Sequence, residues 1–364
     1  MDLSRFLIAW RTISVRDREV VDALVHPGHA GPSGELQQAL SRWPGTWYWS
    51  DENGRRHLVL TRPRPGAGRD AWALNIALLL ATLFTTTWAG ATVAGTLPHT
   101  SLFGFSTGGL SAVAWLRGLA GGLSFSVPLV AILLAHELGH YFAARAYQLD
   151  VSPPYFIPLP FVELIGTMGA FIRLRTVVSD RRQLIDVGAA GPFAGFVVAL
   201  PVLWFGLANS VPHDGFQGMV LVADRAFALG DSLLTLAVRT ATSGATGIAL
   251  HPVAFAGWFG MFVTMLNLLP LAQLDGGHIL FAAAPRWHRR GAVAVLGVVL
   301  ALGWYSGWQG WWIFGLLVLV LSRGRINHPP VLDVYRPLPR SRRWLAWASL
   351  VLFVITFAPA PFRL

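Results

Sequence analysis

Two histidines and one glutamate interrupt a long apolar segment of the chain. His136, Glu137 and His140 form an H-E-x-x-H motif, and the run 127–135 before it is apolar throughout. Residues four apart on a helix lie on one face, so both imidazoles can reach one cation. Glu137 is rotated away from the face that the two histidines share, so it lies beside the metal and not on it. From there it can take a proton from a water molecule at the metal. The motif therefore predicts a metal site with a general base beside it.

A second acid lies in another apolar segment. Only Glu137 and Asp275, of 18 acidic residues, lie well within predicted membrane spans, where each ionisable group costs roughly 3 kcal/mol or more. Two histidines leave a tetrahedral zinc ion one protein ligand short, so Asp275 is the expected third ligand. Pro270 and the glycine pair 276–277 break the span and favour a wet site. His278 is a competing ligand, and Asp275 could instead cap a helix at the kink.

Positioning these residues requires a helical scaffold in a membrane. The chain has 364 residues, of which 54% are hydrophobic and only 13% charged, and this excludes a disordered or ordinary cytosolic protein. We expect a mainly α, polytopic helical bundle over residues 69–364. Its seven predicted spans are 72–96, 123–146, 187–208, 252–284, 291–306, 308–322 and 343–360. The fifth and sixth could form a membrane hairpin, and the weakly apolar segment 103–122 leaves an eighth span open.

The first 68 residues differ from the rest and predict a small, soluble α+β domain. They hold much of the acidic count, and they lack the apolar core and cleavage site of a secretory signal. The stretches 45–49 and 57–60 flank an Asn-Gly pair, which predicts a β-hairpin. The proline-rich stretch 62–66 predicts the linker that ends this domain.

The basic residues predict an orientation. The net charge is +10 and all 28 basic residues are arginines, clustered around 62–69, 173–182, 286–290 and 323–343. Their alternation with arginine-poor loops fits the positive-inside rule better than nucleic-acid binding. We therefore expect a multi-pass protein of the cell inner (plasma) membrane, with a cytoplasmic N-terminus and an active site toward the cytoplasmic side. Cysteine is absent, which excludes disulfides, thiolate zinc sites and cysteine catalysis.

These motifs resemble those of the site-2 proteases, a family of intramembrane zinc metalloproteases. Besides H-E-x-x-H, the segment 267–276 matches N-x-x-P-x-x-x-L-D-G at every fixed position. The segment 166–170 resembles the G-T-x-G-A element of the branch that lacks a PDZ domain and is related to the chloroplast homologues. The resemblance covers about residues 120–285, the expected protease core. It implies one Zn²⁺ bound by His136, His140 and Asp275, with Glu137 as general base and then acid.

The resemblance and the residue types also suggest where a substrate binds. Asn267 would contact the substrate or stabilise the developing oxyanion, although an interhelical hydrogen bond is an equal alternative. Gly166, Thr167 and Gly169 lie in an apolar, β-capable stretch, whose strand edge could pair with an unwound substrate backbone. A plain surface hairpin is the alternative there, and Glu163 is expected to be a solvated loop acid. The G-P-x-A-G element at 191–195 predicts tight helix packing and no chemistry.

The predicted function is hydrolysis of peptide bonds in or near transmembrane segments of membrane proteins. The expected partners are a transmembrane protein substrate and the lipid bilayer, with no nucleic acid, and the oligomeric state stays open. A metal-ion transporter is one alternative, because it would also bury His and Asp in broken helices. A family member without catalysis, acting as a membrane scaffold, is the other.

Overall fold

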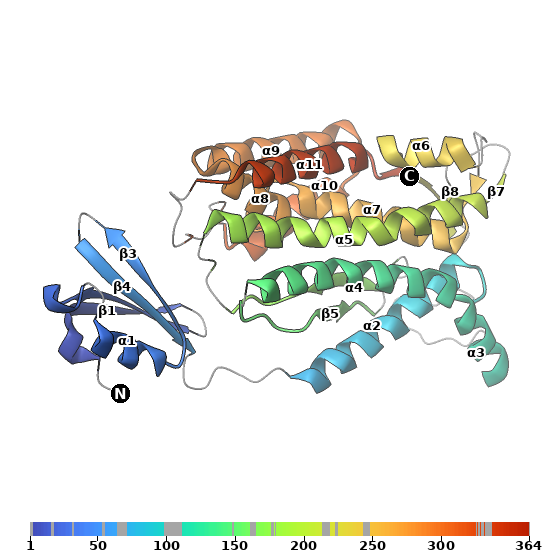
Figure 1. Ribbon diagram of the computed structural model, residues 1–364. Helices are drawn as coiled ribbons and strands as arrows, with labels where there is room; N and C mark the ends of the chain where they lie inside the picture. The colour runs from blue at the N-terminus through green and yellow to red at the C-terminus, as the bar shows by residue number, and fades with distance from the viewer. Residues whose placement is uncertain are drawn as a thin grey trace. The chain divides into compact units, whose positions relative to one another are not determined.

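The chain divides into two compact units, which are described separately. One unit is Met1–Ala71 with Leu149–Val151 and Leu174–Val177, and the other contains the remaining residues. Figure 1 shows the computed structural model. It describes residues 3–15, 18–30, 33–52, 55–63, 71–97, 111–147, 149–160, 165–175, 178, 180–212, 219–222, 225–242, 248–324, 326, 328, 331 and 337–363.

The N-terminal unit contains a four-stranded antiparallel sheet in the order β1-β2-β4-β3. Its elements are η1 (Ser4–Phe6), β1 (Leu7–Val15), β2 (Arg18–Val25), η2 (Pro27–His29), α1 (Gly34–Ser41), β3 (Thr46–Glu52) and β4 (Arg55–Pro63). β3 and β4 pair from Thr46–Thr61 to Glu52–Arg55, as the hairpin prediction requires. The Asn-Gly turn itself and the predicted linker beyond Pro63 lie outside the described residues. Leu58 and Leu60 alternate along β4 and face Leu36 of α1 in the core of this unit.

Three helices of the second unit are long and apolar enough to cross a membrane. They are α2 (Trp72–Val93), α4 (Leu123–Ala146) and α5 (Arg181–Ala208), with 22, 24 and 28 residues. They correspond to the first three predicted spans. A shorter helix, α3 (Ala112–Gly121), occupies part of the weakly apolar segment before α4. The mainly helical fold is therefore confirmed, whereas seven spans are supported only in part.

The fourth predicted span is interrupted around Pro270, as predicted, whereas the glycine pair 276–277 lies within the first turn of α8 and does not break it. α7 (Pro252–Leu268) ends two residues before Pro270, and α8 (Asp275–Ala283) begins at the acid of interest. Ala272, between them, adopts a left-handed backbone with φ of 44°. Beyond it the chain forms α9 (Pro285–Tyr305), α10 (Gly310–Leu321) and α11 (Arg340–Thr356). Their role as further spans stays a prediction.

Two small sheets accompany the helices. β5 (Tyr155–Pro158) and β6 (Thr167–Phe171) form an antiparallel hairpin in the connection between α4 and α5. A five-stranded sheet has the order β11-β9-β8-β10-β7, with α6 (Leu233–Thr242) following β9. Its strands are β7 (Val211–Pro212), β8 (Met219–Val222), β9 (Arg225–Leu229), β10 (Ile248–Ala249) and β11 (Phe362–Arg363). The second sheet was not predicted, because strands of two to five residues leave little period-two signal.

α5 is the central helix of this unit. It packs against α4, α7 and α8, and Figure 1 shows α4 and α5 lying side by side. Small residues allow this close packing, since a Cβ on Gly257 of α7 would lie 2.5 Å from the Leu203 nitrogen of α5. Phe125, Leu129 and Phe255 fill the core around these helices. α5 thereby joins α4, with its two histidines, to α8, with its aspartate.

Candidate metal centre

Three side chains from two helices meet at one point. His136 and His140 come from α4, and Asp275 is the first residue of α8. The two Nε2 atoms lie 3.1 Å apart, and each lies 3.3 Å from Asp275 Oδ2. His136 and His140 are buried, and Asp275 is partly buried. The structure therefore brings together the three residues that the sequence analysis grouped as metal ligands, and this group could hold a metal ion.

The triangle of donor atoms fits zinc. Four ligands at 2.0–2.1 Å from a tetrahedral ion lie about 3.3 Å from one another, close to the observed 3.1–3.3 Å. Two imidazoles and one carboxylate are also the ligand types of catalytic zinc sites that keep a fourth position for water or substrate. Across the described part of the chain, no other group of three His, Asp or Glu residues comes as close together.

A hydrogen bond from its second ring nitrogen orients the His140 imidazole. His140 Nδ1 lies 2.7 Å from the Val187 carbonyl oxygen of α5. Nδ1 must donate this bond, which leaves the Nε2 lone pair of His140 available to a cation. On the other ring, the Asn267 amide nitrogen lies 3.2 Å from His136 Nε2. The structure therefore places Asn267, at the end of α7, beside the donor triangle.

His278 does not compete for the site. Its Nδ1 lies 2.6 Å from His328 Nε2, and its ring meets that of His328 edge-on. It belongs to α8, like Asp275, but among the described residues the group of donor atoms that lie close together contains Asp275 and not His278. The alternative ligand set, with His278 in place of Asp275, is therefore not the arrangement found.

Glu137 lies beside the triangle without joining it. Its side chain is buried, and it receives a backbone hydrogen bond from Ile172, the residue after β6. The β5–β6 hairpin therefore reaches the residue predicted to be the general base. Within the described residues, β6 pairs with β5 on one edge and with no strand on the other.

The three hairpin residues proposed for substrate binding have structural contacts. Gly166 and Gly169 adopt positive φ angles of 75° and 100°. The Thr167 hydroxyl donates to the Ile157 carbonyl and accepts from the Gly169 N–H, at 2.9 and 3.0 Å. These contacts shape the hairpin, and a role in substrate binding stays a prediction. Glu163 lies outside the described residues.

A glycine face on α5 is the feature that the sequence analysis undervalued. A Cβ on Gly191 would lie 2.0 Å from His140 Nε2, and one on Gly195 would lie 3.2 Å from the His136 ring. The G-P-x-A-G element therefore makes room for both imidazoles, beyond the helix packing that was predicted. Gly191 and Gly195 are four residues apart, as are His136 and His140 on α4. This equal spacing was the signal in the sequence that could have revealed the role of the glycines.

We expect Gly191→Ala to lower the zinc content of the purified protein at least about tenfold. The new methyl group would overlap His140 Nε2, and the closely packed α4 and α5 backbones leave it little room to move. Metal analysis of the purified chain measures the effect. Gly297→Ala on α9 is the matched control, because nothing lies within 4 Å of its Cβ position. Full zinc content in Gly191→Ala would show that the helices adjust.

An ion pair fixes the segment of α5 that carries the Val187 carbonyl. The Asp186 carboxylate accepts hydrogen bonds from Arg342 of α11, Nε at 3.0 Å and Nη2 at 2.8 Å, and from the Tyr147 hydroxyl at the end of α4. These bonds to Asp186 raise the pKa of Arg342 above its usual range, so Arg342 stays charged at any physiological pH. α11 is thereby tied to α4 and α5 beside the triangle.

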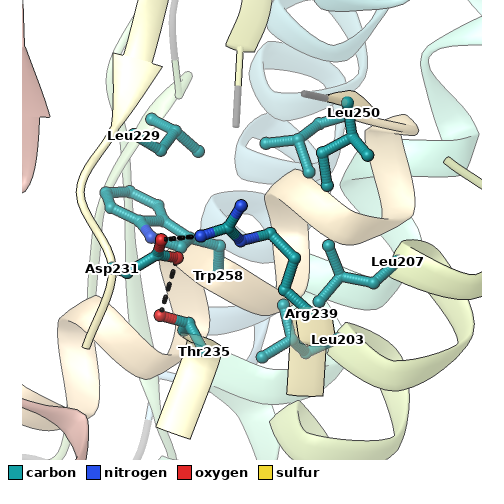
Figure 2. A pocket seen from close by; sticks show the side chains of 9 residues that line it. Leu203, Leu207, Leu229, Asp231, Thr235, Arg239, Leu250 and Trp258 are labelled. Atoms are coloured by element: carbon teal, nitrogen blue, oxygen red, sulfur yellow. Dashed lines mark hydrogen bonds and ion pairs between the residues drawn. The ribbon is translucent and has the colours of Figure 1, made fainter. Parts of the chain in front are cut away.

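A separate pocket lies toward the other end of α5. Figure 2 shows Arg239 and Asp231 as an ion pair in it, with the Thr235 hydroxyl donating to Asp231. Leu203 and Leu207 of α5 line it together with Trp258. None of the predicted site residues lines this pocket, so it is distinct from the candidate metal centre.

Comparison with known proteins places this centre in a family. Residues 124–304 match the model of peptidase family M50, a range that includes the histidines, Glu137, Asn267 and Asp275. The chain contains a peptidase family M50 domain. This confirms the resemblance to the site-2 proteases, and the M50 domain begins within two residues of the start of α4. No solved structure matches the chain.

Plant proteins are similar to this chain over most of its length. It is 32% identical over 251 residues to the probable zinc metalloprotease EGY1, chloroplastic, of Arabidopsis thaliana, covering 65% of this chain and 43% of that protein. It is 31% identical over 262 residues to EGY2 of the same plant, covering 70% and 44%. The chain therefore spans less than half the length of these relatives. Their names and the family match support a zinc metalloprotease, and the long apolar helices support a membrane protein.

Proposed function

We propose that this protein is an intramembrane zinc metalloprotease that hydrolyses peptide bonds in or near transmembrane segments of membrane-protein substrates. The observation that carries the proposal is the donor triangle with Glu137 beside it, built partly on a helix long and apolar enough to span a bilayer. A buried cluster of ionisable residues in such a helix is costly without a function. The M50 domain and the named relatives support the same class of enzyme.

His136, His140 and Asp275 would hold one Zn²⁺ per chain. When bound, zinc supplies Lewis acidity, which polarises a carbonyl and lowers the pKa of water to about 7. Glu137 takes the proton from the attacking water as its oxygen bonds to the scissile carbonyl carbon. Glu137 then returns the proton to the leaving amine as the C–N bond breaks. The buried position of Glu137 keeps bulk water from carrying this proton instead.

The remaining predicted site residues would orient the substrate. A helical substrate hides its peptide bonds, so it must unwind before cleavage. One edge of β6 pairs with no strand among the described residues, and Gly166, Thr167 and Gly169 shape it. This edge would bind the unwound backbone by main-chain hydrogen bonds. The Asn267 amide, beside His136, would donate to the developing oxyanion.

The proposed setting is the cell's inner membrane, with the N-terminus and the active site toward the cytoplasm. The arginine clusters support this orientation. The partners are then a transmembrane protein substrate and the lipids around it, without nucleic acid. The Arabidopsis relatives carry the word chloroplastic in their names, which applies to those proteins.

The proposal is tested with the full chain reconstituted in liposomes that contain a single-span membrane protein. We expect discrete cleavage products by mass spectrometry, loss of cleavage with a zinc chelator, and recovery on adding zinc. Zinc-dependent ion flux without a peptide product would favour the transporter alternative. Bound zinc without cleavage or flux across a panel of single-span substrates would favour the inactive scaffold.

A further inference from the structure

We propose that Asn75 and Thr85 of α2 are positioning residues that hold the β5–β6 hairpin in register with Glu137. The inference rests on the proposed function, because it concerns how a substrate strand would be placed. Neither residue belongs to the motifs that identify the M50 domain in this sequence, and neither contacts the donor triangle. Their side chains reach the hairpin from a different helix than the one that carries the histidines.

Thr85 anchors the start of β6. Its hydroxyl donates a hydrogen bond to the Gly166 carbonyl oxygen at 2.6 Å. The two backbones also touch directly, since a Cβ on Gly166 would lie 2.3 Å from the Thr85 carbonyl oxygen. Gly166 has φ of 75°, a conformation that strains other residues. Glycine at this position therefore lets the hairpin lie on α2, and the hydroxyl fixes where it lies.

Asn75 anchors the segment before β5. Its amide nitrogen lies 2.9 Å from the Pro154 carbonyl oxygen and 3.3 Å from that of Pro153. Asn75 is 5% exposed, whereas its neighbours Leu74 and Ile76 are 50% and 53% exposed. A buried amide nitrogen is costly unless it is hydrogen-bonded, and the two proline carbonyls accept from it, whereas Asn75 Oδ1 has no partner among the described residues. The asparagine faces the hairpin on a largely apolar helix that also carries several threonines.

The two anchors together define the hairpin's position along α2. They lie ten positions apart in the sequence, which corresponds to about 15 Å along a helix. One anchor holds the entry to β5 and the other holds the entry to β6, while Ile172 after β6 donates to Glu137. The hairpin is therefore held between α2 on one side and the residue proposed as the base on the other. A shift along α2 would change which peptide bond of a bound strand reaches Glu137.

Thr85→Val and Asn75→Leu remove the anchoring donors and keep the branching pattern of each side chain. For a transmembrane substrate of the reconstituted full chain, we expect KM to rise about tenfold or more, while kcat changes less than about threefold, because the ligands and Glu137 are untouched. Zinc content should stay constant. Hydrogen exchange of the amides in 155–171 should accelerate about tenfold. Thr85→Ser, which keeps the hydroxyl, should restore the wild-type values.

Thr86→Val is the matched control. Thr86 is buried on the same helix, and its hydroxyl donates to the carbonyls of Thr82 and Leu83 within α2. It should leave KM and hairpin exchange unchanged. If both anchor variants keep wild-type KM and exchange, the inference is overturned while the proposed function stands. If the wild type cleaves nothing, the proposed function fails, and the exchange rates still decide whether α2 holds the hairpin. If Thr85→Val does not fold, Asn75→Leu decides the result.

Discussion

Replacing Glu137 by glutamine should lower the rate of peptide cleavage by about a thousandfold and leave the zinc content unchanged. Glutamine has nearly the shape of glutamate but cannot take the proton from the attacking water. Its amide oxygen can still accept the backbone hydrogen bond from Ile172, so the hairpin contact survives. Glu137 is not part of the donor triangle, and zinc binding should therefore persist.

Single-turnover cleavage of an inserted transmembrane substrate, together with metal analysis of the same preparation, measures both parts of this result. Glu35→Gln is the control. This substitution removes the same charge, but from a residue that lies exposed on α1 of the N-terminal unit. More than about a tenth of wild-type activity in Glu137→Gln would mean that another group is the base. Loss of zinc would mean that Glu137 is a ligand.

Replacing Asp275 by alanine should weaken zinc binding by at least about a hundredfold, because even the partners of metal ligands contribute 10–100-fold. The Asp275 oxygen is equidistant from the two imidazoles, at 3.3 Å, and no other described acid completes a group with them. Without this carboxylate, two neutral rings would have to hold the ion. Cleavage should be lost together with zinc.

His278→Ala is the matched control for this prediction. It removes a possible ligand from the same helix, but one that faces His328 in the structure. It should keep its zinc, as measured by metal analysis after dialysis at a fixed free zinc concentration. Because Asp275 also begins α8, Asp275→Asn provides a second variant that preserves a polar helix start. Zinc retained in Asp275→Ala and lost in His278→Ala would contradict the assigned triangle.

The two halves of the site depend on α5, a helix that supplies none of the ligands. The Val187 carbonyl orients His140, and Gly191 and Gly195 leave room for both rings. The Asp186–Arg342 ion pair ties the turn of α5 that carries Val187 to α11. Because α5 packs on both α4 and α8, a change in its path would move the histidines relative to the aspartate. This is the physical basis for expecting a large effect from one methyl group at Gly191.

Much of the candidate site followed from local features of the sequence. The spacing of His136 and His140 places two imidazoles on one helix face wherever that helix lies. Pro270 breaks an apolar run, and the structure has its helix break there, although the glycines after Asp275 lie within α8. The rarity of acids within apolar runs singled out Glu137 and Asp275, because burying a charge in hydrocarbon has a cost that composition alone exposes.

Other features were decided only by the tertiary structure. Whether Asp275 or His278 meets the histidines depends on how α8 is rotated against α4 and α5, and a sequence period carries no such information across a helix break. The hairpin's attachment to Asn75 and Thr85 joins residues about 80 positions apart, and the five-stranded sheet is built from very short strands. Local propensity determined the helices and their breaks, whereas packing between distant segments determined which side chains meet.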